Sequence, residues 1–239
     1  MTQQTTIDDF LGGQVRLIQS KKGLRATSDS VLVAAAVPIK LGESLLDVGT
    51  GNGVIALCVN ARVPGVSLTG LDCQEEVLTL AGQNAALNQC AFEGILADLG
   101  QRPSPIHGRL FHHVVTNPPF YDEAHIRQNK EVARAYHQGI ALADWLRFCL
   151  RHIRAKGSLT VIHRPEALPE ILSVVTKRLG NIEVIPILSK QNEPAKRVIV
   201  RGWLGSKKPL SLMPGLVMHS ASDKRTLMAE QILRDGIGI

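Results

Sequence analysis

The chain has 239 residues, of which 44% are apolar and 20% are charged, a composition typical of a globular protein rather than a disordered or fibrous one. No apolar run approaches the roughly 20 residues that a membrane-spanning helix needs, and the acidic start lacks the basic segment of a secretory signal, so we expect a cytoplasmic protein. The net charge of +6 favours a polyanionic partner such as nucleic acid but does not require one.

Short β-branched and apolar runs alternate with helical patterns from residue 44 onward. Strands are predicted at 44–49, 66–72, 94–98, 110–117, 158–164, 182–188 and 196–204, and helices at 52–62, 74–88, 142–157 and 165–180. Gly157 is expected to end the third of these helices, and Pro165 to begin the fourth. The alternation predicts an α/β fold with a doubly wound, mostly parallel seven-stranded sheet and an antiparallel last strand. Residues 1–43 are expected to form a short N-terminal extension packed on one domain, 1–239.

The cysteines of the chain are widely spaced and form no CxxC pair. This spacing argues against a structural zinc site and against a disulfide framework. We therefore expect no bound metal, and small buried thiols in a reducing compartment. The four residues are Cys58, Cys73, Cys90 and Cys149.

A glycine-rich turn, D-x-G-x-G-x-G, follows the first predicted strand and runs from Asp47 to Gly53. A dinucleotide-binding GxGxxG turn would need a glycine where Val54 stands, and a phosphate-binding P-loop would need a following Gly-Lys-Ser/Thr, so neither reading fits. An acid that leads such a turn repels a pyrophosphate and suits a ligand with an ammonium or sulfonium group. The turn therefore predicts a cationic ligand without phosphates.

Two further acids end the next two predicted strands. Asp72 ends the second strand, a position that faces a ribose in doubly wound folds, and Asp98 ends the third, where it could accept a hydrogen bond from an adenine amine. A cationic amino-acid part, a ribose and an adenine together fit S-adenosylmethionine. The predicted cofactor-binding residues are Asp47, Gly49, Thr50, Gly51, Asn52, Gly53, Asp72, Cys73, Asp98, Leu99 and Asn117.

The fourth predicted strand ends in the run Asn117-Pro118-Pro119-Phe120. Proline donates no backbone hydrogen bond and cannot continue a sheet ladder, so the strand must stop at Asn117 in a stiff elbow. The side-chain oxygen of Asn117 and the carbonyl of Pro118 could accept the two hydrogens of an amine and hold its nitrogen in line with a methyl group on sulfur. Phe120 would stack on a flipped-out base. These four residues are the predicted catalytic residues, and a stiff loop without chemistry is the alternative.

The turn and the elbow together resemble class I S-adenosylmethionine-dependent methyltransferases, a group with a Rossmann-like sheet that modifies planar amide or amine nitrogens. In that group, Asn/Asp-Pro-Pro-aromatic motifs mark adenine-N6, cytosine-N4, guanine-N2 and glutamine-N5 enzymes. Residues 24–38, 163–172, 193–202 and 209–219 look like the bacterial tRNA1(Val) adenine-N6-methyltransferase family, which methylates the adenine just 3′ of the anticodon. This resemblance implies a tRNA partner, and it implies that Thr27 and Asp29 help to close the cofactor pocket. At 133–139 the chain reads ARAYHQG where the family often carries an Arg-His-Glu run.

Other targets and roles are consistent with the same motifs. A guanine-N2 enzyme on ribosomal RNA would carry them, and so would a glutamine-N5 enzyme on a release factor, although 43 residues are too few for the large N-terminal helical domain of the latter. A non-enzymatic S-adenosylmethionine- or RNA-binding module would have no use for the amine-holding elbow. His163 and Arg164 end the fifth strand, where they could form part of the rim of the site. Candidate phosphate-binding residues are Lys21, Lys22, Arg25, Lys190, Lys196, Arg197, Arg201, Lys207 and Lys208.

Overall fold

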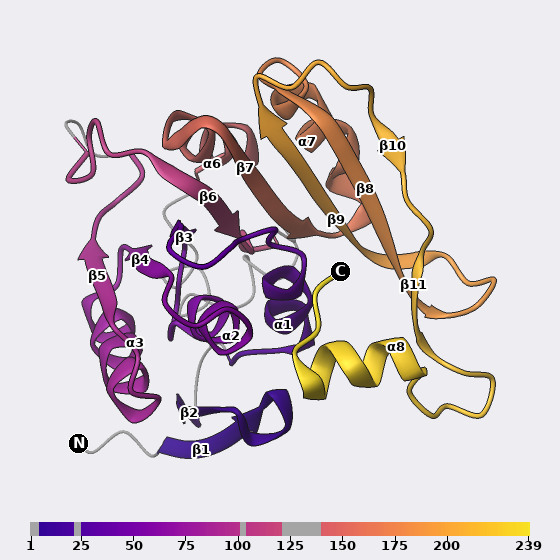
Figure 1. Cartoon of the computed structure of the whole chain (residues 1–239), viewed down its shortest axis with the longest axis horizontal. Coiled ribbons are helices and arrows are strands. Elements are labelled where there is room, and N and C mark those ends of the chain that lie inside the picture. The colour runs from indigo at the N-terminus through magenta and orange to yellow at the C-terminus, as the bar shows by residue number, and fades with distance from the viewer. Residues whose placement is uncertain (1–4, 22–24, 101–103, 121–139) are drawn as a thin grey trace, which may run out of the picture.

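A computed structural model of the protein describes residues 5–21, 25–100, 104–120 and 140–239. Within these ranges, nine strands form one sheet in the order β10-β8-β9-β7-β6-β3-β4-β5, and β11 also pairs with β8 (Figure 1). The strands are β3 (Ser44–Val48), β4 (Ser67–Asp72), β5 (Phe92–Leu96), β6 (Phe111–Thr116), β7 (Ile153–His163), β8 (Leu179–Lys190), β9 (Ala195–Leu204), β10 (Ser211–Leu212) and β11 (Leu216–His219).

The doubly wound, mostly parallel sheet is confirmed, whereas the number of strands is larger than the seven predicted. Strands β3 to β7 pair parallel with one another, and β9 runs antiparallel between β7 and β8 as expected. The two additional strands, β10 and β11, lie along the β8 edge and pair parallel with it (Figure 1). They were missed because runs of two and four residues are too short to show an alternating pattern.

Helices cover both faces of the sheet and form two separate cores. Neighbouring residues of one strand point to opposite faces of the sheet. Leu45 therefore lies in the core that contains α1 and α2, and Leu46 lies in the core that contains α6 and α7. The helices are α1 (Ser28–Ala35), α2 (Val54–Arg62), α3 (Glu75–Leu87), α6 (Leu142–Arg151), α7 (Leu168–Val175) and α8 (Leu227–Glu230), with shorter helical turns η1 (Leu11–Gly13), η3 (Pro165–Ala167) and η4 (Gln231–Asp235).

Two glycines lie in strands although the sequence placed them at the ends of helices. Helix α6 ends at Arg151, and Gly157 lies inside β7, where the pairing with β6 shifts register. A Cβ atom at Gly157 would lie 2.5 Å from the carbonyl oxygen of His112, so close approach of two strands, rather than a helix cap, requires the glycine. Gly180 likewise belongs to β8, because α7 ends at Val175.

The N-terminal hairpin region and the C-terminal segment both pack on the sheet face that α1 and α2 cover (Figure 1). Strands β1 (Thr5–Phe10) and β2 (Val15–Ser20) form an antiparallel hairpin, and β2 contacts α3. The C-terminal turn η4 contacts η1 and α1, and the backbone N–H of Ile239 donates to the carbonyl oxygen of Ala35 at 3.0 Å. None of the helices in the described ranges has the length and apolar character needed to cross a membrane.

Candidate active site

The predicted site residues meet at one edge of the sheet. Because β3, β4, β5, β6 and β7 are parallel neighbours, their carboxyl ends share that edge. The glycine-rich turn follows β3, Asp72 ends β4, Asp98 follows β5 and Asn117 follows β6. Residues far apart in sequence are therefore brought to one place by topology.

The glycine-rich turn has a backbone that only glycine adopts readily. Gly49, Gly51 and Gly53 have φ angles of +73°, +56° and +84°. A Cβ atom at Gly49 would also lie 2.8 Å from the indole ring of Trp145, whereas one at Gly51 would meet no atom within 4 Å. The turn therefore packs against Trp145 at Gly49, whereas at Gly51 the space is open and a ligand can approach the backbone.

Asp47 carries a fully buried carboxyl group beneath this turn. The hydroxyl of Thr50 donates to Oδ2 at 2.8 Å, and Oδ1 has no hydrogen-bond partner in the described part of the chain. The pKa of Asp47 is raised to about 7, chiefly by burial and also by the charge of Asp72, while the Thr50 hydrogen bond and, more weakly, the backbone of Ala56 oppose the rise. A carboxylate placed so is stabilised by a cationic ligand.

Asp72 and Asp98 order the backbone around the same edge. Asp72 is 4% exposed, and its two oxygens accept hydrogen bonds from the backbone N–H groups of Gly51 at 3.0 Å and Gln74 at 3.1 Å. Asp98 is partly exposed and accepts from the N–H of Gly100 at 2.7 Å. A carboxylate has further lone pairs, so both can still accept from a ligand. The neighbouring Cys73 is partly buried and Leu99 is buried, and no disulfide joins the four cysteines, all of which lie in the described ranges.

The elbow after β6 presents an acceptor with no partner. The Oδ1 atom of Asn117 is buried and makes no hydrogen bond with any described residue. Pro118 is buried and Pro119 is partly buried. The ring of Phe120 contacts His163 edge-on, with 4.7 Å between ring centroids. The elbow therefore carries an unsatisfied amide oxygen at its first residue and an aromatic ring three residues later.

A hydrogen-bonded chain that the sequence did not reveal fixes the elbow relative to the glycine-rich turn. The indole N–H of Trp145 donates to the hydroxyl of Thr116 at 2.9 Å, and this hydroxyl donates to the carbonyl oxygen of Val48 at 2.8 Å. Trp145 is 1% exposed, and its ring lies against Gly49. Its spacing of three residues from Phe148 in a helical pattern predicts burial but cannot show this contact.

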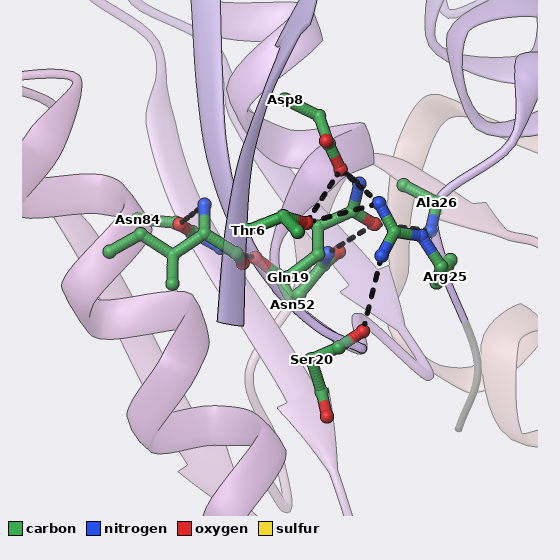
Figure 2. Close-up of polar contacts among 9 residues, drawn as sticks. Thr6, Asp8, Gln19, Ser20, Arg25, Ala26, Asn52 and Asn84 are labelled. Carbon is green, nitrogen blue, oxygen red and sulfur yellow. Dashed lines mark hydrogen bonds and ion pairs between the residues drawn. The ribbon is translucent and has the colours of Figure 1, made fainter. Parts of the chain in front are cut away.

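The N-terminal hairpin contributes a second set of positioning residues, shown in Figure 2. Gln19 is 3% exposed, and its Oε1 accepts from the N–H of Ala26 at 2.8 Å and, at the longer distance of 3.5 Å, from the amide of Asn52 in the glycine-rich turn. The amide of Asn84 donates to the carbonyl oxygens of Ile18 at 3.1 Å and Asn52 at 3.0 Å. The sequence held one signal for this contact, a polar Asn84 beside Ala85 on the buried side of a helix.

Residues 20–186, well over half of the chain, match the methyltransferase small domain family. The chain belongs to this family. This match confirms the prediction that the protein is a methyltransferase that depends on S-adenosylmethionine as its cofactor.

The methyltransferase is similar to several named proteins. A tRNA1(Val) (adenine(37)-N6)-methyltransferase from Actinobacillus pleuropneumoniae is 24% identical over 234 residues, which cover 96% of this chain and 97% of that protein. A release factor glutamine methyltransferase from Koribacter versatilis is 35% identical, but over only 91 residues, or 38% of this chain and 32% of that protein. A crystal structure described as a predicted O-methyltransferase from Agrobacterium tumefaciens superposes on this chain with a TM-score of 0.72 at 25% sequence identity. The superposition covers 88% of this chain and 97% of the chain in that crystal structure.

Two residues expected to close the cofactor pocket of the methyltransferase lie at the start of α1. Thr27 precedes the helix with an exposed side chain, and no described hydrogen bond joins this side chain to the glycine-rich turn. Asp29 is partly buried and pairs with Arg197, with 2.6 Å between Oδ2 and Nε. Asp29 therefore connects α1 to β9 on the side of the elbow.

The basic residues proposed as phosphate contacts have different environments in the methyltransferase. Arg201 is part of the structure, since it pairs with Glu183 at 2.6 Å and donates to the carbonyl oxygens of Ala36 and Ile239. Arg25 pairs with Asp8, and Lys190 with Asp223. Lys21, Lys196, Lys207 and Lys208 are exposed, whereas Lys22 and the 133–139 stretch lie outside the described residues.

Proposed function

We propose that this enzyme is an N-methyltransferase that transfers the methyl group of S-adenosylmethionine to an exocyclic base nitrogen, with adenine N6 in the anticodon loop of a tRNA as the acceptor. The observation that carries the proposal is the buried, unpartnered Oδ1 of Asn117. Leaving a buried acceptor unsatisfied costs about 1–3 kcal/mol, so an unpartnered oxygen at this edge indicates a ligand that completes it.

The residues of the carboxyl edge fit the cofactor. The buried carboxylate of Asp47 suits its cationic amino-acid part, and Asp72 has lone pairs free for the ribose hydroxyls. We assign contacts with the adenine to Asp98 and Leu99. The open backbone at Gly51 admits the ligand, and Asn52, Gly53, Thr50 and Cys73 complete the predicted lining. The chemistry that S-adenosylmethionine supplies here is an electrophilic methyl group on a sulfonium sulfur.

The elbow would hold the acceptor amine. Oδ1 of Asn117 and the carbonyl of Pro118 accept its two hydrogens, which turns the nitrogen lone pair toward the methyl group, while Pro119 stiffens the elbow and Phe120 stacks on the base. Transfer would form the nitrogen–carbon bond as the carbon–sulfur bond breaks, which leaves a neutral thioether and a positively charged amine that would then lose a proton to water. No general base is needed before transfer.

RNA is the favoured class of substrate because of the extent of the similarity. Proteins named as tRNA1(Val) adenine-N6-methyltransferases match nearly the full chain, although at 24% identity. The glutamine methyltransferase matches a shorter stretch at 35% identity, which makes a protein glutamine the second candidate. A guanine-N2 target on RNA would use the same elbow.

Methyl transfer from labelled S-adenosylmethionine into unmodified total tRNA tests the proposal, with nucleosides separated by mass spectrometry. We expect N6-methyladenosine with the wild type and a loss of at least about 100-fold in rate with Asn117→Ala, a size known for the removal of one positioned polar group. Asn60→Ala, which removes the same group from α2, serves as the control. Calorimetry should show similar cofactor affinity in all three proteins. Label in N2-methylguanosine or in release-factor glutamine would contradict the proposed acceptor.

A further inference from the structure

Three side chains that the proposed methyl transfer does not use surround the ring of Phe120. The guanidinium of Arg197 lies 4.9 Å from the ring centroid and that of Arg164 lies 5.7 Å from it. The ring of His163 contacts the same ring edge-on. We call these four residues the arginine cradle.

The topology of the sheet explains why residues from two distant segments meet here. Strand β9 runs antiparallel to β7, and His163 at the end of β7 pairs with Val198 near the start of β9. Arg197 therefore reaches the carboxyl edge from β9, while Arg164 reaches it directly after β7. Both flank the elbow that follows the neighbouring strand β6.

The positive charge of the cradle is only partly compensated. Arg164 is exposed, and its side chain forms no ion pair with a described residue. Arg197 uses Nε for Asp29 and Nη1 for the carbonyl oxygen of Lys196, which leaves Nη2 without a hydrogen bond to the part of the chain that the structure describes. Two guanidinium groups thus face Phe120, and of the two only Arg197 is ion-paired with a described residue, Asp29.

His163 gives a second, independent sign of an absent ligand. The residue is 7% exposed, and its Nδ1 is buried with no partner among the described residues. Its pKa is lowered to about 4, chiefly by burial; the backbone of Arg164 opposes this shift, the charges of Arg164 and Arg197 add to it, and the weaker effect of Glu166 also opposes it. His163 is therefore neutral at physiological pH, and it leaves a buried polar atom unsatisfied beside the two arginines.

We propose that Arg164 and Arg197 bind the phosphates that flank the target nucleotide, while the base of that nucleotide stacks on the ring of Phe120. This inference rests on the proposed function and deepens it, because it makes the cradle the feature that selects nucleic acid over a protein glutamine. A base that stacks on Phe120 displaces a guanidinium from the ring, and a phosphate of the same strand provides the bidentate acceptor for it. A glutamine side chain brings no such anion.

Binding of a labelled, unmodified RNA hairpin, measured by fluorescence anisotropy over a range of salt concentrations, tests the cradle without requiring catalysis. Arg164→Gln and Arg197→Gln should each weaken binding and reduce the slope of log affinity against log salt by about one. Arg197→Lys should keep most of the slope. Arg109→Gln removes the same charge at the opposite end of β6 and should leave the slope unchanged. Affinity of Arg164→Gln for S-adenosylmethionine should equal that of the wild type.

The outcomes separate the cradle from the proposed function. An unchanged salt slope in both glutamine variants, with RNA bound and methylated, would overturn the cradle and leave the methyl transfer standing. A reduced slope with no methylation of any RNA by the wild type would support the cradle and refute the proposed reaction. Failure of the wild type to bind RNA would overturn both.

Discussion

At the scale of single residues, Asp47 carries a fully buried carboxyl group. Its pKa is raised from 3.8 to about 7 because the carboxyl group is buried. Between these two values the folded protein holds a proton that the unfolded chain has released. The free energy of unfolding contributed by Asp47 therefore falls as the pH rises from about 4 to about 7. A cationic ligand reverses this effect by stabilising the ionised form.

We predict that affinity for S-adenosylmethionine decreases as the pH falls below about 7, because the cofactor must then bind against a proton on Asp47. If the cofactor binds only when Asp47 is ionised, its affinity should fall by about tenfold for each pH unit below the pKa of that residue. Calorimetry between pH 5.5 and 8 would measure it, and Asp47→Asn should flatten the profile and bind weakly at every pH. An equally steep profile in Asp47→Asn would assign the titration to another residue.

At the scale of secondary-structure elements, helix α3 holds the hairpin through two side-chain amides that take the place of a neighbouring strand. Asn84 accepts from the N–H of Ile18 at 2.7 Å and donates to its carbonyl oxygen. Asn88, one helical turn later, makes the same pair of bonds with Arg16 at 2.8 Å and 2.7 Å. Asn84 is fully buried, whereas Asn88 is partly exposed.

This difference predicts unequal effects for the same substitution. Asn84→Ala leaves buried groups of β2 and of the glycine-rich turn unpaired, so we expect a loss of about 1–3 kcal/mol in the free energy of unfolding and weaker cofactor binding. Asn88→Ala is the matched control, and water can replace its amide, so the loss should stay below about 1 kcal/mol. Urea denaturation and cofactor titration of both variants would measure this. Equal losses in the two would contradict a special role for Asn84.

At the scale of the whole molecule, the C-terminus packs onto the first helix. The N–H of Ile239 donates to the carbonyl oxygen of Ala35, and Arg201 donates to the carbonyl oxygens of Ala36 and Ile239. Two cores share one sheet, and elements from both ends of the described chain join the same core. We therefore propose that residues 1–239 form a single domain.

This arrangement predicts one cooperative unfolding transition. Circular dichroism and the fluorescence of the two tryptophans, buried Trp145 and partly buried Trp203, should report the same midpoint, since Trp145 lies in one core and helices in both cores contribute to the dichroism. S-adenosylmethionine at 100 times its Kd should raise the free energy of unfolding by about 2.7 kcal/mol. Separate midpoints for the two probes would contradict the single domain.

The sequence by itself determined the alternation of strands and helices, the glycine-rich turn and the Asn-Pro-Pro-Phe elbow. These features are local, because periodicity, glycine and proline restrict the backbone of the residues that carry them. The carboxyl ends of parallel strands necessarily share an edge, so the meeting of Asp47, Asp72 and Asn117 could also be predicted. Only the tertiary structure placed Arg197 against Phe120, Asn84 against the hairpin and Trp145 beneath Gly49. It also added β10 and β11 to the sheet. These contacts join segments far apart in sequence, and they depend on strand register and helix packing that no local pattern specifies.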